Sequence, residues 1–146
     1  MKVVLYTFLI LLSSHVYSGV DSDSSNQLSD LTPLEWKNRI IIANTVENPA
    51  ELIAQFENQT TGINERVIVW FIIQPKQVLT NYQGNLAVRF ASNIQKTYQL
   101  KQGEVVLIGK DGGVKSSRQY LDLTTTFGEI DAMPMRLQEM RRNPFS

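Results

Sequence analysis

The hydrophobic residues of this chain fall into short runs separated by polar segments. The run over 67–73 is apolar without alternation, which is typical of a strand covered on both faces of an α/β sheet. Shorter apolar runs predict two further buried strands, at 39–43 and 104–108. The pair Asp111-Gly112 is a strong hairpin signal, and it predicts a turn that leads into a fourth strand over 114–120.

Three segments show the apolar spacing of amphipathic helices. The first starts at Asn48 with an Asn-x-x-Glu capping pattern and can end at Gly62. In the second, over 85–100, apolar residues recur at intervals of four. The third is expected over 124–133, where Pro134 either interrupts it or starts a second short helix. The resulting order β-α-β-α-β-β-α, with a mixed central sheet, predicts a thioredoxin-like α/β fold.

The start of the chain has the features of a secretory signal. A short basic start, the apolar run 3–12 and a small-residue stretch predict a signal peptide over residues 1–18, with cleavage before Gly19. The apolar run is half of the roughly 20 residues needed to cross a bilayer, so no membrane span is expected after cleavage. The Ser/Asp/Asn-rich segment 19–30 is expected to be a flexible leader, and 31–146 one domain. The mature protein is therefore expected to be secreted or periplasmic.

Charge and composition exclude several classes of function. Removal of the signal takes away Lys2 and the only histidine, His15, and leaves 13 basic against 14 acidic side chains, a formal charge of −1. A nucleic-acid partner is not expected, because binding normally needs a clearly basic face. The chain has no cysteine, so thiol redox chemistry is excluded and no disulfide stabilises the fold. No Asp-rich loop is present to form an oxygen-only metal site, and no cofactor is expected.

Four motifs resemble the domain-of-unknown-function family 4174. They are the segments 36–39, 65–66, 107–115 and 130–141, and the resemblance covers nearly the whole mature chain. It implies a thioredoxin-like fold related to peroxiredoxins, with relatives among bacterial exported proteins and animal extracellular sushi-repeat proteins. Because the family carries no agreed activity, the resemblance assigns no catalytic residue.

The places where thioredoxin-like enzymes keep their redox residues hold other side chains here. Those enzymes carry the reactive cysteine just after the first strand, which corresponds to 44–48 in this chain, and a proline before the third strand, where Gln102-Gly103 stands. We therefore expect a binding or structural module of unknown partner. The alternative is a non-thiol enzyme, a hydrolase or peroxide-handling protein that uses carboxylate and basic side chains. A deep pocket with a strongly perturbed carboxylate would favour the enzyme, and an exposed apolar patch would favour the module.

The expected topology brings three of the motifs together. If the third strand is antiparallel to the first, its end lies beside the start of the first strand, at the pole opposite the missing redox site. Two interpretations of this convergence remain: a salt-bridged clasp in which Lys37 or Arg39 meets Asp131 or Glu139, or a docking site for a protein partner or an anionic ligand. The candidate binding residues are Trp36, Lys37, Arg39, Lys110, Asp111, Asp131 and Arg136.

Two further features of the sequence bear on the surface and the core. The two tryptophans, Trp36 and Trp70, are expected to be core anchors. The triplet Asn58-Gln59-Thr60 matches a glycosylation sequon, which matters only in a eukaryotic secretory pathway.

Overall fold

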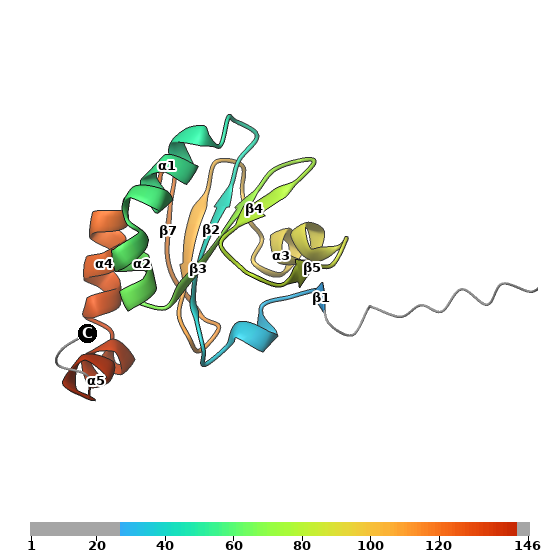
Figure 1. Cartoon of the computed structure of the whole chain (residues 1–146). Helices are drawn as coiled ribbons and strands as arrows, with labels where there is room; N and C mark the ends of the chain where they lie inside the picture. Colours follow the sequence, from blue (N-terminus) through green and yellow to red (C-terminus); the bar gives the residue numbers. More distant parts are fainter. Residues whose placement is uncertain (1–26, 143–146) are drawn as a thin grey trace, which may run out of the picture.

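The computed structural model describes residues 27–142, so the predicted signal peptide and most of the predicted leader lie outside the described residues. Its centre is a five-stranded mixed sheet with the strand order β4-β3-β2-β6-β7 (Figure 1). The mixed α/β class expected from the sequence is confirmed. The strands are β2 (Arg39–Asn44), β3 (Ile68–Ile73), β4 (Val78–Thr80), β6 (Val105–Ile108) and β7 (Val114–Arg118).

The strand register defines two poles of the sheet. β2 runs parallel to β3, with Arg39 opposite Ile68, and antiparallel to β6, with Ile40 opposite Ile108. The end of β6 therefore lies beside the start of β2. We call this end of the sheet the strand-start pole, and the end at which β2 finishes, at Asn44, the strand-end pole.

Helices cover both faces of the sheet (Figure 1). α1 (Ala50–Asn58), α2 (Thr60–Glu65) and α4 (Leu123–Asp131) lie on one face, and α3 (Phe90–Thr97) lies on the other. α5 (Pro134–Arg142) follows α4 at the strand-start pole. The remaining elements are a 3-10 turn, η2 (Thr32–Leu34), and a small parallel pair formed by β1 (Gln27–Leu28) and β5 (Asn85–Leu86). No helix among residues 27–142 is long and apolar enough to span a membrane.

The two central strands are buried on both faces, as the absence of alternation predicted. Alternate residues of β3 enter two different cores: Phe71 packs with Phe90 of α3, and Trp70 packs with Phe56 of α1. The Trp70 and Phe56 rings stack with centroids 4.7 Å apart. Trp70 is thus a core anchor, as expected.

Several predicted boundaries were wrong. The helix expected from Asn48 to Gly62 is broken at Gln59, and Gly62 lies inside α2 instead of ending a helix. The helix expected over 85–100 is confined to Phe90–Thr97, because residues 85–86 pair with β1. The edge strand β4 was not predicted. Pro134 starts a second short helix, which was one of the two expected alternatives.

Two residues lie in surroundings opposite to those expected. Leu28, placed in the flexible leader, is 3% exposed and belongs to the core, so the packed domain begins before residue 31. Trp36, expected in the core, is 69% exposed. It sits in a turn with a positive φ of 62°, held by its N–H donating to the Lys110 carbonyl at 2.6 Å. That backbone conformation turns its side chain away from the core.

Candidate functional site

The strand-start pole holds a cluster of ion pairs, which we call the ionic clasp. It joins the start of β2, the turn before β3, the β6–β7 hairpin, the end of α4 and the first turns of α5 (Figure 1). The hairpin brings a cation to this pole because Gly112 adopts a φ of +76° in its turn. The clasp residues are Arg39, Arg66, Lys110, Asp131, Arg136 and Glu139.

Glu139 of α5 is the centre of one half of the clasp. Arg39, which is 1% exposed, donates to both of its carboxylate oxygens, at 3.1 and 3.3 Å. Lys110 from the hairpin donates to the same carboxylate at 2.7 Å. Burial alone would raise the pKa of Glu139, but the hydrogen bonds from Lys110 and Arg39 together lower it. This half of the clasp therefore ties α5 to β2 and to the hairpin with an ionised carboxylate.

Asp131, at the end of α4, is the centre of the other half. It accepts hydrogen bonds from Arg66 at 2.6 and 3.1 Å and from Arg136 at 3.3 Å. The remaining guanidinium donors point at backbone carbonyls: Arg136 donates to Glu65 at 2.9 Å, and Arg66 donates to Gly62 at 3.0 Å. The Arg66 guanidinium also lies 4.4 Å from the centre of the Phe127 ring.

The structure brings together four of the seven predicted binding residues, namely Arg39, Lys110, Asp131 and Arg136. The other three do not join the clasp. Lys37 donates to the Pro33 carbonyl at 3.0 Å, and Asp111 pairs with Lys115 at 2.7 Å. The Trp36 side chain is exposed beside them.

Arg66 was not predicted for this pole, whereas Glu139 was expected as one alternative partner of Lys37 or Arg39, and its pairing with Arg39 is confirmed. Both stand in the family-like motifs, yet neither has a local pattern that singles it out, since their partners come from distant segments. Within residues 27–142, one buried polar side-chain atom of the clasp has no hydrogen-bond partner: Nε of Arg39. The other hydrogen bonds of the clasp side chains go to one another or to nearby backbone carbonyls. This geometry supports the structural interpretation of the cluster.

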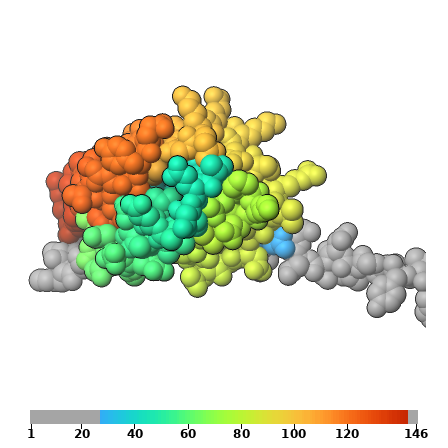
Figure 2. All heavy atoms as spheres, turned by 90° about the horizontal axis from the view of Figure 1, so that it is seen from above, coloured from blue at the N-terminus to red at the C-terminus, as the bar shows by residue number. Residues whose placement is uncertain are grey.

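A groove opens at the opposite, strand-end pole, and we call it the strand-end groove. Its main arm encloses about 600 Å³. Figure 2 looks down on this pole, where the teal loop after β2 lies near the orange residues that follow β7. The loop after β2 begins at Thr45, because β2 ends at Asn44, whose side chain is fixed by a hydrogen bond to the Lys101 carbonyl at 2.9 Å.

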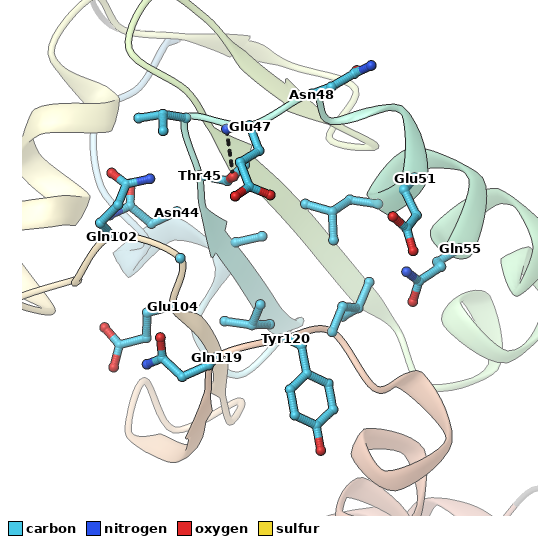
Figure 3. A pocket seen from close by; sticks show the side chains of 16 residues that line it. Asn44, Thr45, Glu47, Asn48, Glu51, Gln55, Gln102, Glu104, Gln119 and Tyr120 are labelled. Carbon is cyan, nitrogen blue, oxygen red and sulfur yellow. Dashed lines mark hydrogen bonds between the residues drawn. The ribbon is translucent and has the colours of Figure 1, made fainter.

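The floor of the main arm is apolar and its walls are polar (Figure 3). The apolar lining residues include Ala43, Leu52, Val105 and Leu121. Val46 and Tyr120 also line the groove. These two hydrophobic side chains are 61% and 67% exposed. An apolar floor with polar walls is the composition common to ligand sites in proteins.

Three carboxylates line the main arm: Glu47 and Glu51 on one side, and Glu104 across from Glu51 (Figure 3). Among residues 27–142 none of the three has a basic side chain within ion-pair distance, and no basic residue lines the arm. The pKa of Glu104 is lowered, first by the hydrogen bond from the Lys101 N–H at 2.7 Å and then by the Ser117 hydroxyl. Glu104 is therefore ionised at neutral pH.

A smaller arm of about 390 Å³ adjoins the main one. Gln55, Tyr120 and Leu121 line both arms, so the two meet at Tyr120. Asp122 contributes a fourth carboxylate here, and its pKa is lowered by hydrogen bonds from the Thr125 hydroxyl and N–H. Asn58, the sequon asparagine, lies in the wall of this smaller arm.

The sequence did not predict the groove as a binding site. Its lining comes from segments that are far apart in the chain, so no motif spans it. One signal was present: residues 44–48 follow the first strand, the place at which thioredoxin-like enzymes carry their cysteine. What stands there instead is a polar loop with an exposed carboxylate, Glu47.

The chain was also compared with known proteins. Neither a curated protein nor a solved structure matches it. One family model, described as Domain of unknown function (DUF4174), matches residues 30–139, which is more than half of the chain. The chain therefore belongs to this family, as the four sequence motifs suggested.

Proposed function

We propose that this chain is an exported, thioredoxin-like binding module that holds a cationic ligand in the strand-end groove. One observation carries the proposal: four carboxylates line the two arms of the groove, and among residues 27–142 no basic residue lines either arm. Glu47 and Glu51 form no ion pair among the described residues, and Glu104 and Asp122 accept hydrogen bonds only from neutral groups, so the groove has a net negative charge that attracts a cation. The ligand would therefore supply the missing positive charge.

The thioredoxin-like and exported parts of the proposal have separate support. The order of β2, α1, β3, α3, the β6–β7 hairpin and α4 agrees with the arrangement expected from the sequence. Export rests on the basic, apolar and small-residue regions of residues 1–18. In a thioredoxin-like arrangement the groove lies where redox enzymes of that fold keep their cysteine, and this position supports a binding site there.

The groove chemistry supports binding over acid–base catalysis. A general acid needs a proton near neutral pH, which in a carboxyl group requires a raised pKa. The pKa values of Glu104 and Asp122 are instead lowered by the hydrogen bonds that they accept. What the groove offers is recognition: negative charge, amide groups and an exposed tyrosine ring.

The test is a titration with a small cationic probe, N-acetyl-arginine amide, followed by NMR. We expect shifts of the backbone signals of Glu47, Glu51 and Glu104, and at least a tenfold loss of affinity in the variant with all three changed to glutamine. A matched control removes three carboxylates outside the groove, through Glu35→Gln, Glu57→Gln and Asp111→Asn. The control should bind within twofold of the wild type. Equal binding by the groove variant and the wild type would contradict the proposal.

A further inference from the structure

We infer that the ligand of the strand-end groove is an extended polypeptide segment that carries lysine or arginine side chains. This inference rests on the proposed function and adds the chemical class of the ligand. Three features of the groove carry it: its two-armed shape, its free amide groups, and the placement of its carboxylates in both arms.

The shape indicates an elongated ligand. The main arm of about 600 Å³ and the smaller arm of about 390 Å³ are lined jointly by Gln55, Tyr120 and Leu121, so a ligand passing over Tyr120 can occupy both. The main arm alone would accommodate a compact small molecule. A second arm joined to it gives space along which an extended chain can continue.

The polar walls can bind a polypeptide backbone. Gln55, Asn58, Gln102 and Gln119 line the two arms, and within the described residues their side chains make no hydrogen bond of their own. Each side-chain amide offers both a donor and an acceptor, which is the pair of groups that each peptide unit of an extended chain requires. These free amides can therefore pair with a backbone regardless of its side chains.

The carboxylates of the groove indicate which side chains the bound polypeptide carries. Glu47, Glu51 and Glu104 line the main arm, and Asp122 lines the smaller one. Across residues 27–142 no group of acidic side chains is arranged to hold a metal ion, so an ammonium or a guanidinium group is the cation that fits. Tyr120, 67% exposed between the arms, presents a ring on which a guanidinium can stack.

The experiment compares a single arginine residue, a peptide that carries two arginines, and spermine, a polyamine with more positive charges than the peptide. The probes are N-acetyl-arginine amide, spermine, and a nine-residue peptide with arginine at its third and seventh positions in an otherwise alanine and serine sequence. We expect the peptide to bind at least tenfold more tightly than the single residue and more tightly than spermine, because it alone supplies backbone groups to the amides.

A blocking variant tests whether the smaller arm provides the additional affinity for the peptide. Asn58→Trp places a large side chain in the wall of the smaller arm without a change of charge, and Asn64→Trp, on exposed α2 surface, is the matched control. The blocking variant should lose the extra affinity for the peptide and keep the affinity for the single residue. Spermine binding as tightly as the peptide, or a peptide affinity unchanged by Asn58→Trp, would overturn the inference and leave the proposed function standing. Equal affinity of the wild type and of the variant with all three glutamates changed to glutamine would instead overturn the proposed function.

Discussion

The two poles of this protein both gather charged side chains, but they use them in different ways. In the ionic clasp, nitrogen and oxygen atoms of oppositely charged side chains lie 2.6 to 3.7 Å apart and come from five separate segments. In the strand-end groove the charged side chains have one sign and form no ion pair among the described residues. The charges at the first pole neutralise one another, whereas the groove at the second pole keeps a net negative charge that can attract a ligand. The difference separates a structural device from a candidate binding site.

Replacement of the buried clasp arginine should have the largest effect. Arg39→Ala removes three hydrogen bonds and leaves Glu139 with one fewer partner, so we expect a loss of about 3 kcal/mol in the free energy of unfolding. Urea unfolding followed by circular dichroism measures this. Lys37→Ala, two residues away and outside the clasp, should change stability by less than about 0.5 kcal/mol. Unchanged stability in Arg39→Ala, with loss of partner capture, would instead support docking at the clasp.

Glu139→Gln should have a smaller effect that depends on pH. At pH 7 we expect a loss of about 2 kcal/mol, because the ion pairs with Arg39 and Lys110 become hydrogen bonds to a neutral group. The pKa of Glu139 is lowered in the folded protein, so its contribution is present above the ordinary value of 4.5 and is lost as the pH falls through the folded value. The difference between wild type and variant should therefore shrink in acid. A difference that stays constant from pH 7 to pH 3 would contradict this account.

The hairpin that positions Lys110 can be tested at its turn. Gly112 has a φ of +76°, and a Cβ atom there would lie 2.7 Å from Oε1 of Glu35. Gly112→Val should therefore cost about 1 kcal/mol or somewhat more. Gly128→Ala in α4 is the control, because an added methyl group there would meet no neighbouring side chain within 4 Å; it should stabilise the protein by about 0.5 kcal/mol. Equal melting temperatures for Gly112→Val and wild type would be evidence against the strained turn.

The smallest effect on stability is expected in the groove. Glu47 and Glu51 have no ion pair within the described chain, so Glu47→Gln and Glu51→Gln together should change the free energy of unfolding by less than about 0.5 kcal/mol. Thermal unfolding checks this. A large loss of stability would mean that these carboxylates support the fold, as the clasp does, and would remove the contrast between the two poles.

The sequence predicted best what depends on neighbouring residues. The unbroken apolar run of β3 indicated a strand buried on both faces, and Asp111-Gly112 indicated the hairpin, because both signals are local. It failed where distant segments decide the outcome. Residues 85–86 carried a helical pattern but pair with β1, and Trp36 looked like a core residue but lies in a turn fixed by the Lys110 carbonyl.

The same limit of prediction from sequence applies to the ionic clasp and to the strand-end groove. The convergence of Arg39, Lys110 and Asp131 followed from the expected strand directions, so topology alone brought the motifs to one pole. The Arg39–Glu139 pair was one of the expected alternatives and is confirmed. The other partners did not follow, because they depend on side-chain reach: Lys37 and Asp111 lie in the same motifs as Arg39 and Lys110, but their side chains bind elsewhere. The groove was missed because a cavity is a property of the packed chain.

The most direct test of the account is an NMR map of where the nine-residue arginine peptide binds. We predict that its largest shifts fall on the backbone signals of residues 44–52, 102–105 and 119–124, which line the strand-end groove. The clasp segments 36–39, 109–113 and 131–139 should remain unchanged. Shifts concentrated in the clasp segments, with the groove signals unmoved, would contradict the assignment of binding to the groove and of structure to the clasp.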